Sequence, residues 1–386
     1  MKKIAVVTST RAEFGLLLPV IKCLKTYESE NLKIKLIVTG THLSKDFGYT
    51  VDEIERNHCE IDYKIQISID SQTALDISKN QADTLVAFTK LFEKECFDGI
   101  VILGDRYEML SIAIAAGNTH TPIFHLCGGD TTEGAMDEWI RHSITKMSYM
   151  HFPTNEESYH RIIQLGESPS RVFNYGSTSI DNIIRLATIK KSEALSDIGL
   201  PDCKYAICTY HPVTMEEGGI DQQIEAFLDA ILAFPDIEFI VTKSNADQGG
   251  ACINQRLDEA EKGIENLHVF SSLGVVRYLS LMRYARFVLG NSSSGIIETP
   301  AFKIPTINIG DRQRGRLQSK SIINCGPEKE SIVSAISQAI TPEFQKICQT
   351  VVSPYGDGHA AEQIAKKIVE TVMNGRIDLK KKFYNM

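Results

Sequence analysis

A polar stretch at residues 290–298, Gly-Asn-Ser-Ser-Ser-Gly-Ile-Ile-Glu, has the residue types of an anion-binding turn. The apolar residues 287–289 before it predict a short buried strand, and the isoleucines within it predict the start of a helix. A strand-to-helix turn presents unpaired backbone N–H groups and the positive end of a helix dipole, which together suit a phosphate. An ordinary helix cap needs only one Ser or Asn, so three serines between two glycines favour a bound ligand. Glu298 lies four residues after Ser294, on the same helical face, where it could accept a hydrogen bond from a sugar hydroxyl.

Charged side chains also follow two of the apolar runs in the first half of the chain. Asp105 and Arg106 stand just after residues 99–103, and Arg11 follows residues 3–7. Open α/β sheets bind ligands at the carboxyl ends of their strands, so these residues are placed for chemistry or for an anion. The sequence leaves two alternatives open: a structural ion pair between Asp105 and Arg106, and a solvated turn arginine at position 11.

The most acidic loop lies at residues 127–138, after another predicted strand. It is rich in glycine and carries four acids, namely Asp130, Glu133, Asp137 and Glu138. Arg141 lies four residues after Asp137 on the helix that follows, so an i, i+4 ion pair is the simplest explanation of these two residues. Loops that carry this many acids after a sheet strand more often do chemistry, because the scaffold positions them rigidly.

Short apolar runs alternate with helical periodicity along the chain, which predicts an α/β fold built on parallel strands. The alternation pauses at the polar residues 190–204 and restarts at 205–209. We therefore expect a domain change near residue 180 and two successive βα domains of similar size. Residues 172–175 are predicted to form a further strand of the first domain, and residues 306–309 the last clear strand of the second.

The composition excludes several classes of protein. A chain of 386 residues with 43% hydrophobic and 23% charged residues is long enough for two domains with sizeable cores. The net charge of −8 favours neither nucleic acid nor an anionic membrane as a partner. No apolar run approaches the roughly 18 residues of a membrane span, and the N-terminus turns polar too soon for a signal peptide. The nine cysteines are scattered without a C-x-x-C pair, so we expect no disulfide framework or zinc site, and a reducing cytoplasm.

Five motifs that occur in order resemble the UDP-N-acetylglucosamine 2-epimerase family. They are Thr-Arg-Ala-Glu-Phe-Gly at 10–15, Gly-Asp-Arg at 104–106, His-Pro at 211–212, the serine-rich turn at 290–295 and Gly-Asp-Arg-Gln-Arg-Gly-Arg at 310–316. The resemblance runs from residue 3 to about residue 375 and is closest to the hydrolysing branch, which makes free N-acetylmannosamine and UDP for sialic acid synthesis. The non-hydrolysing enzymes resemble Arg-Pro-Glu at the first motif and His-Arg at the third.

The resemblance implies a fold like that of the GT-B glycosyltransferases, with two Rossmann-like domains facing across a cleft and the C-terminal helix crossing back to the first domain. The expected boundaries are 1–178 for an N-terminal domain with the catalytic acids, 179–358 for a UDP-binding domain, and 359–386 for the returning helix. It also implies a UDP-sugar substrate, UDP as a product, no metal or redox cofactor, and a homodimer or homotetramer.

By motif match, the nucleotide should lie mainly on the second domain. Ser292 and Ser293 would then hold phosphate, and Glu298 would hold the ribose. The remaining residues that the resemblance assigns to UDP are Arg11, Arg106, His211, Asn245 and Arg312. Several converging donors suit a diphosphate, and arginine supplies planar forks for it.

The family chemistry removes the proton at C2 with loss of UDP from C1, giving a 2-acetamidoglucal to which water then adds. This needs a carboxylate as base, a proton donor and cations for the departing diphosphate. Asp105 and Asp137 match the family's catalytic acids, and Arg141 and His142 belong to the motif that follows the second.

One position departs from the family pattern. Many hydrolysing members resemble His-Ile-Glu-Gly-Gly-Glu where this chain has His-Leu-Cys-Gly-Gly-Asp at 125–130, so Cys127 replaces a glutamate thought catalytic. A small buried apolar side chain is a simpler interpretation of Cys127 than a catalytic thiol. Asp130 or Glu133 could supply the missing acid, or this branch does without it; Asp130 is kept as a lesser catalytic candidate.

Four alternatives remain for the function. The first is the same reaction on a UDP- or GDP-linked 2,4-diacetamido-2,4,6-trideoxyhexose of the legionaminic acid pathway, which one pocket contact could select. The others are a non-hydrolysing epimerase, a glycosyltransferase on the same fold, and a non-catalytic nucleotide-sugar-binding protein. Fold alone decides none of them.

Overall fold

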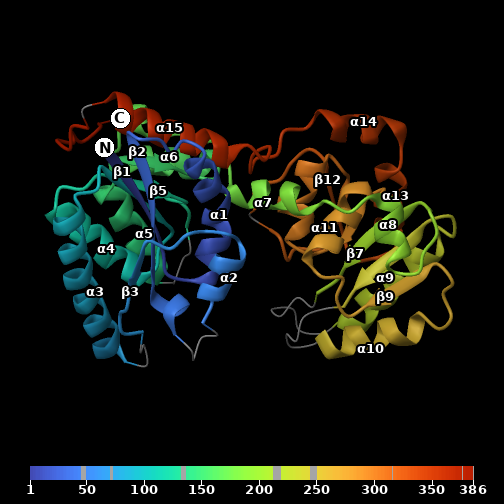
Figure 1. Ribbon diagram of the computed structural model, residues 1–386. Helices are drawn as coiled ribbons and strands as arrows, with labels where there is room; N and C mark the ends of the chain where they lie inside the picture. Colours follow the sequence, from blue (N-terminus) through green and yellow to red (C-terminus); the bar gives the residue numbers. More distant parts are fainter. Residues whose placement is uncertain are drawn as a thin grey trace. The chain divides into compact units, whose positions relative to one another are not determined.

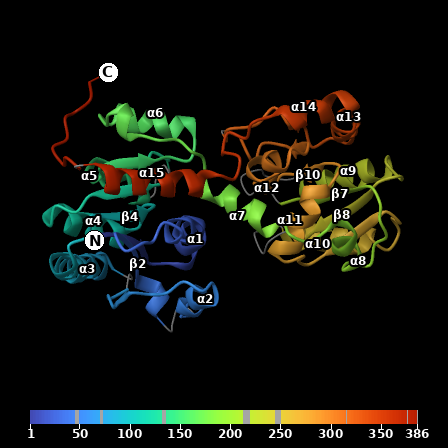
Figure 2. The same ribbon diagram turned by 45° about the horizontal axis from the view of Figure 1, so that its top comes forward.

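The chain divides into two compact units in a computed structural model that describes residues 1–44, 49–69, 73–131, 136–211, 219–243, 250–314, 316–375 and 377–385. Unit 1 comprises Met1–Asn182 with Gly358–Met386, and unit 2 comprises Ile183–Asp357. Within the described residues, each unit is built on a six-stranded parallel sheet flanked by helices (Figures 1 and 2). The predicted α/β class with two Rossmann-like sheets is therefore confirmed.

The sheet of unit 1 has the strand order β3-β2-β1-β4-β5-β6. Its strands are β1 (Lys2–Thr8), β2 (Leu32–Thr39), β3 (Tyr63–Ile65), β4 (Gly99–Leu103), β5 (Ile123–Leu126) and β6 (Met150–Phe152). Its helices are α1 (Arg11–Lys25), α2 (Val51–Arg56), α3 (Ala74–Glu95), α4 (Tyr107–Asn118), α5 (Met136–Met147) and α6 (Glu156–Gln164), with a 3₁₀ turn η1 (Gly40–Leu43). The order reverses between β1 and β4, which is where such sheets bind ligands.

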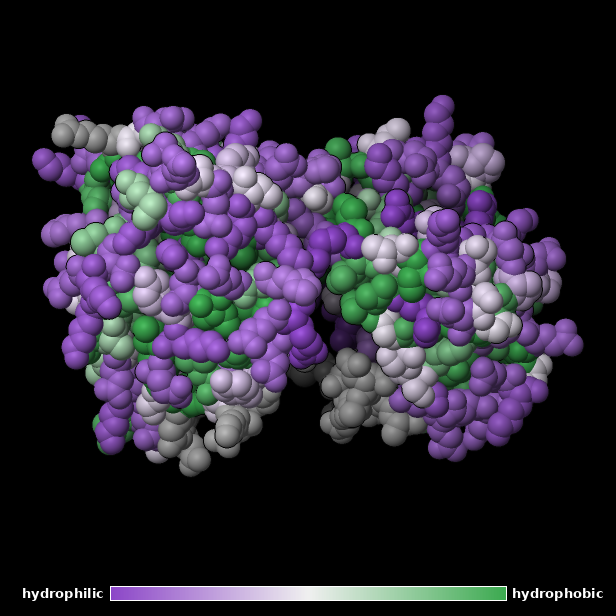
Figure 3. Space-filling view, in the orientation of Figure 1, coloured by the Kyte–Doolittle hydropathy of each residue, from purple (hydrophilic) through white to green (hydrophobic). Residues whose placement is uncertain are grey.

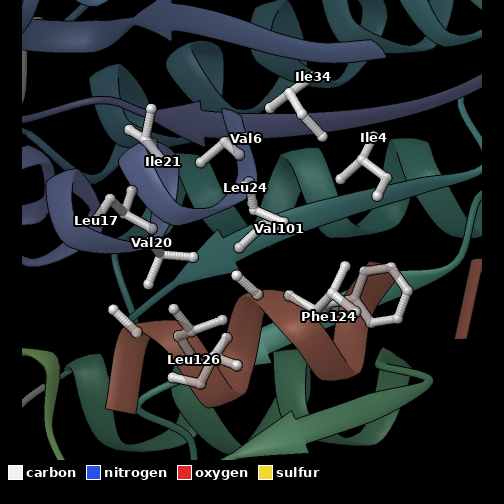
Figure 4. Close-up of a cluster of buried hydrophobic side chains, with 14 of the residues drawn as sticks. Ile4, Val6, Leu17, Val20, Ile21, Leu24, Ile34, Val101, Phe124 and Leu126 are labelled. Atoms are coloured by element: carbon white, nitrogen blue, oxygen red, sulfur yellow. The ribbon is translucent and has the colours of Figure 1, made fainter. Parts of the chain in front are cut away.

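Buried apolar side chains pack against both faces of this sheet. On one face, side chains of α1 such as Leu17, Ile21 and Leu24 pack against Val6 and Val101 of the central strands (Figure 4). The C-terminal helix α15 (Ala360–Asn374) joins the same layer and contacts α1, so the end of the chain belongs to unit 1. Helices α3, α4 and α5 cover the other face. Burial on both faces explains why the central strands are continuous apolar runs.

The sheet of unit 2 has the order β12-β11-β10-β7-β8-β9, which reverses between β7 and β10. Its strands are β7 (Tyr205–Thr209), β8 (Glu238–Thr242), β9 (Leu267–Phe270), β10 (Val288–Gly290), β11 (Thr306–Ile309) and β12 (Ile322–Cys325). Its main helices are α8 (Lys191–Ser196), α9 (Ile220–Leu232), α10 (Gly250–Ala260), α11 (Val275–Tyr284), α13 (Lys329–Ala339) and α14 (Pro342–Thr350). Helix α7 (Thr178–Leu186) begins in unit 1 and ends in unit 2.

One strand prediction is wrong, and one strand of the structure was not predicted. Residues 172–175 form no strand, because only Val172 bridges to His151 and the chain then leaves the sheet edge. The rings of Phe173 and Tyr175 instead lie 6.2 Å from that of Phe152. In the second unit, the strand prediction at 306–309 is right, but β12 follows it at the sheet edge and was not predicted.

The residues after α15 dock onto unit 1 through a buried carboxylate. Lys381 Nζ lies 2.6 Å from Glu167 Oε2 and donates to the backbone carbonyl oxygens of Lys146 and Ser148 at 2.9 and 2.8 Å. Lys146 and His151 reach the same carboxylate at 2.6 and 3.1 Å. Burial opposes the charge of Glu167, but hydrogen bonds from His151, Lys146 and Lys381 lower its pKa to about 2. The tail thus completes the neutralisation of a buried charge.

Polar and charged residues cover most of the face of the molecule seen in Figure 3. In the described parts of the chain, no helix combines the length and the apolar character that crossing a membrane would require.

We expect Lys381→Ala to lower the free energy of unfolding by about 1–3 kcal/mol, because the buried Glu167 carboxylate loses one of its cations. Urea denaturation of the full chain measures this. The matched control is Lys380→Ala, since the neighbouring lysine is exposed, and its effect should stay within about 0.5 kcal/mol. Equal unfolding midpoints for the two variants would contradict a stabilising role for the docked tail.

Candidate functional site

The serine-rich turn of unit 2 begins where β10 meets β7. Gly290 has φ +136°, and a Cβ atom there would lie 2.0 Å from the carbonyl oxygen of Thr209, so only glycine allows this close approach. The helix predicted after the turn is one α-turn long, α12 (Ser294–Ile297), followed by the 3₁₀ turn η3 (Thr299–Phe302). Pro300 cannot continue an α-helix, and the dipole of so short a helix is small. Attraction of an anion here must come mainly from N–H groups and serine hydroxyls.

Asn291 connects this turn to two other loops through hydrogen bonds. Its side chain is fully buried; Oδ1 accepts from the backbone N–H of His211 at 2.7 Å, and Nδ2 donates to the carbonyl of His211 at 2.8 Å. Its own carbonyl accepts from Arg312 Nη1 at 3.1 Å and Gln313 Nε2 at 2.9 Å. One asparagine therefore brings together three of the motifs that the sequence singled out.

A pocket of about 360 Å³ opens beside the turn within unit 2. His211, Ser292 and Ser294 line it, together with residues that the sequence analysis did not select, namely Thr209, Thr242, Lys243, Ser271, Ser272, Leu273, Gly274, Val275 and Tyr278. The Ser-Ser-Leu-Gly segment at 271–274 follows β9 directly. Small polar residues and a glycine just after a strand are the same sequence pattern that indicated the serine-rich turn. The pocket thus lies along the carboxyl ends of β7, β8 and β9.

Glu298 brings an unsatisfied acceptor to this region. Its Oε2 is buried and has no hydrogen-bond partner among the residues that the structure describes. Burial raises the pKa of the carboxyl, and a hydrogen bond from Ser294 opposes this. A hydroxyl group of a bound ligand would supply the missing donor, which is the role that the resemblance implies for this residue.

Arg141 is the centre of the polar cluster in unit 1. Its side chain is only 5% exposed, and its Nε donates to Asp105 Oδ2 at 2.8 Å, with a second contact from Nη2 to the same oxygen. Nη1 donates to the backbone carbonyl of Asp130 at 2.7 Å and lies 3.4 Å from Glu138. The structure therefore brings Asp105, the Asp130 loop and α5 together. Arg106 instead pairs with Glu108 at 2.6 Å, so the ion pair between Asp105 and Arg106 left open above is not the arrangement seen.

Asp137 and His142 also lie on α5. Asp137 is exposed in its first turn, while His142 Nε2 lies 3.2 Å from Glu138 Oε1. The other ring nitrogen of His142 is buried without a partner among the described residues. Asp137, Arg141 and His142 thus lie on one helix. Of these three, Arg141 is the one for which the described contacts include an ion pair with a carboxylate of another loop, that of Asp105.

The carboxylate of Asp130 makes structural contacts at the start of α6. Its Oδ1 accepts from the Ser158 hydroxyl and lies 3.4 and 3.5 Å from Thr154 Oγ1 and Asn155 Nδ2. Asn155 is the N-cap of α6, so the Asp130 carboxylate helps to hold the start of that helix. This engagement weakens the case for Asp130 as the substitute for the missing family glutamate.

Cys127 occupies a left-handed backbone position with φ +61°. Burial raises the pKa of its thiol, and the nearby carboxylates of Asp130 and Asp105 raise it further. The thiol is therefore held neutral, as expected for a small apolar side chain and not for a nucleophile.

His125 is a supporting residue that the sequence analysis did not select. It is fully buried, with Nε2 2.9 Å from the carbonyl oxygen of Gly104 and Nδ1 3.2 Å from Thr145 Oγ1. Burial lowers its pKa to about 3, so the ring is neutral and links the Asp105 loop to α5. Three residues of the sequence prediction cannot be placed in this site: Asn245 and Glu133 lie outside the described residues, and the side chain of Arg11 is not described.

We expect Asn291→Asp to weaken binding of UDP, the ligand that the resemblance implies, at least tenfold, because a carboxylate oxygen would face the His211 carbonyl and release the joined loops. Titration calorimetry measures this. The matched control is Asn266→Asp, since Asn266 also bridges two backbone carbonyls of unit 2, those of Phe234 and Ile237. An equal loss of affinity in both variants would mean that general destabilisation, not the Asn291 junction, is responsible.

The chain is similar to known proteins over most of its length. The UDP-N-acetylglucosamine 2-epimerase family model matches residues 25–369. A GDP/UDP-N,N'-diacetylbacillosamine 2-epimerase (hydrolyzing) of Campylobacter jejuni is 39% identical, with 89% of each chain covered. Polysialic acid biosynthesis protein P7 of Escherichia coli is 35% identical over 100% of this chain and 98% of its own.

A solved structure shares the fold at lower identity. It is the UDP-GlcNAc 2-epimerase of Neisseria meningitidis bound to UDP-GlcNAc, with a TM-score of 0.80, 19% identity and coverage of 96% of this chain and all of that one. The family model and the two relatives above decide the classification. This chain belongs to the UDP-N-acetylglucosamine 2-epimerase family.

Proposed function

We propose that the protein is a hydrolysing 2-epimerase that converts UDP-N-acetylglucosamine and water into N-acetylmannosamine and UDP. The observation that carries the proposal is the buried Arg141, which holds Asp105 at the carboxyl end of β4 in a chain of this family. Asp105 is one of the two acids that match the family's catalytic positions. A guanidinium fork of this kind fixes the orientation of a carboxylate that must reach a weakly acidic proton.

The proposed reaction has two stages. A carboxylate, Asp105 or Asp137, takes the proton from C2 while the C1–O bond breaks and UDP leaves with the bonding electrons, giving 2-acetamidoglucal. Water then adds its oxygen at C1, and a proton returns to C2 from the opposite face, which inverts that centre. His142 and Arg141 are the remaining candidates for proton transfer and charge stabilisation.

The departing diphosphate needs hydrogen-bond donors, which residues around the serine-rich turn of unit 2 would supply. Ser292, Ser293, His211 and Arg312 are joined to one another through the Asn291 junction, and Glu298 has an acceptor oxygen ready for a ribose hydroxyl. Arg11, Arg106 and Asn245 complete the proposed set. We further propose that the protein works in a reducing cytoplasm, in keeping with its nine free cysteines, and that it forms the homodimer or homotetramer that the resemblance implies.

A second substrate is favoured by a specific observation. The relative that is 39% identical is named as an epimerase of diacetylbacillosamine carried by GDP or UDP. The same C2 chemistry on a 2,4-diacetamido-2,4,6-trideoxy sugar would differ only in what the pocket accepts at C4 and C6. Such discrimination is decided by one or two contacts, so it must be measured.

A proton NMR time course in D₂O with each UDP-sugar tests the proposal. With UDP-N-acetylglucosamine we expect free UDP and N-acetylmannosamine that carries deuterium at C2, because the proton returned there comes from solvent. Faster turnover of the diacetamido sugar would assign the second substrate. UDP that stays attached to the epimerised sugar would indicate the non-hydrolysing reaction, and binding of UDP without turnover of either sugar would contradict both enzyme assignments.

We expect Asp105→Asn and Asp137→Asn each to lower kcat by at least 100-fold while UDP affinity stays within about threefold, because removal of a general base costs about 10²–10⁴ in rate. Steady-state kinetics and calorimetry measure the two quantities. Asp130→Asn is the matched control: its carboxylate holds the start of α6, so its effect on kcat should be the smallest of the three. Near-normal turnover in both main variants would refute the assignment of these acids.

A further inference from the structure

Unit 1 contains a pair of buried glutamates that the proposed reaction does not use. Glu13 lies in the first turn of α1 and Glu108 in the first turn of α4, and their exposed fractions are 5% and 2%. The fully buried Ser9 joins them, with its Oγ 2.9 Å from Glu13 Oε2 and 2.8 Å from Glu108 Oε1. Because β1 and β4 are adjacent, the pair lies at the point where the strand order reverses.

The geometry requires one more proton than two carboxylates and a serine provide. A serine hydroxyl carries one proton and can donate to one acceptor only. The second short contact of Ser9 Oγ therefore needs a proton from a carboxyl group. Two ionised carboxylates at this separation in a buried site would also repel each other, so one of them keeps its proton.

The neighbouring groups indicate which glutamate is charged. Arg106 Nε donates to Glu108 Oε1 at 2.6 Å, which favours the ionised form of Glu108. Glu13 has no cation at hydrogen-bond distance among the described residues. Its Oε2 accepts from the backbone N–H groups of Ser9 and Thr10 at 2.8 and 3.2 Å, and its Oε1 is buried without a partner among the described residues. Burial and the charge of Glu108 raise the pKa of Glu13 to about 7, although hydrogen bonds from Ser9 and the more distant Arg106 oppose this.

We propose that Glu13 and Glu108 share one proton through Ser9, and that this proton sets how strongly Arg106 attracts an anionic ligand. With the proton in place, Glu13 donates to Ser9, Ser9 donates to the Glu108 carboxylate, and that carboxylate holds Arg106. The three side chains Glu13, Glu108 and Arg106 are then neutral as a group. Loss of the proton gives this group a net charge of −1, and its guanidinium is 39% exposed.

The other groups that face the pair do not titrate in the same range. His42 of η1 lies against Phe14, its Nε2 is 3.0 Å from Thr8 Oγ1, and burial lowers its pKa to about 4. Burial raises the pKa of the Tyr107 phenol, the neighbour of Arg106 on α4. Among the side chains that the structure describes around the pair, Glu13 is thus the one that changes charge near neutral pH.

The consequence is a pH dependence of ligand binding with a definite sign. Because the pKa of Glu13 is raised, the protonated form prevails below about pH 7 and is lost as the pH rises through that value. An added negative charge beside Arg106 weakens the attraction for a diphosphate. This step rests on the proposed function, in which Arg106 faces the diphosphate; the shared proton itself does not.

Glu13→Gln is the discriminating variant, because glutamine has no charge at any pH and its amide oxygen can still accept from the backbone N–H groups at this position of a capping box. We expect the Kd for UDP to rise about fivefold more in the unmodified protein than in Glu13→Gln between pH 6 and pH 8.5. The ratio of the two proteins is the readout, since the titration of UDP itself is the same with both. In turnover, the difference should appear in KM, with kcat of Glu13→Gln near normal at pH 7. Asp52→Asn removes one exposed charge from the first turn of α2 and should leave the pH profile unchanged.

Infrared spectroscopy tests the shared proton without any ligand. We expect a protonated carboxylic acid band at pH 6 that disappears on titration through about pH 7 and is missing in Glu13→Gln. Absence of such a titrating band in the unmodified protein would overturn the proposal even if the variant failed to fold. Parallel pH profiles of Kd in the two proteins would overturn the role given to Arg106. Absence of turnover with every sugar would refute the proposed function while leaving the infrared result decisive for the proton.

Discussion

Parallel pairing at the centre of each sheet is the constraint on which the candidate sites depend. In unit 1, β4 pairs with β1, and in unit 2, β10 pairs with β7. The connections that leave these neighbours run to opposite sides of the sheet, so the loops at their carboxyl ends separate and leave room for polar groups. The Ser9–Glu13 and Asp105–Glu108 segments follow one such pair, and the His211 and Ser292 segments follow the other. The polar groups of both candidate sites gather at these strand ends.

Polar groups at these edges are buried, and burial obliges them to find partners. In unit 1 the guanidinium of Arg141 has Asp105 and the Asp130 carbonyl, and that of Arg106 has Glu108. In unit 2 the amide of Asn291 satisfies both backbone groups of His211. The contacts of Arg141 with Asp105 and of Asn291 with His211 join residues far apart in the sequence. The same contacts that satisfy buried groups therefore fix the positions of the loops, and a loss of one partner would be felt at several loops at once.

The sequence predicted those features whose physical signal is local. Continuous apolar runs such as residues 3–7 and 99–103 marked the central strands, because both faces of a parallel sheet are covered. Where packing depends on distant residues, the prediction failed: aromatic residues at 172–175 pack their rings together without joining the sheet, and the partly exposed edge strand β12 was not recognised. The pairing of Asp105 with Arg141 could not be inferred either, because spacing favoured the sequence neighbours Arg106 and Asp137. The roles assigned to individual site residues stay predictions.

The replacement of a family glutamate by Cys127 changes the charge available in unit 1. The thiol is held neutral, the Asp130 carboxylate is engaged at the start of α6, and Asp105 is compensated by Arg141. Asp137, exposed in the first turn of α5, is then the candidate acid with no such structural task among the contacts described. Asp105, whose orientation Arg141 fixes, and Asp137, which is exposed, could then act as the two carboxylates of the proposed reaction. We infer that Asp105 and Asp137 share the proposed acid–base work in this chain, whereas Glu133 lies outside the described residues, and that a glutamate restored at position 127 would compete with Asp105 for the charge of Arg141.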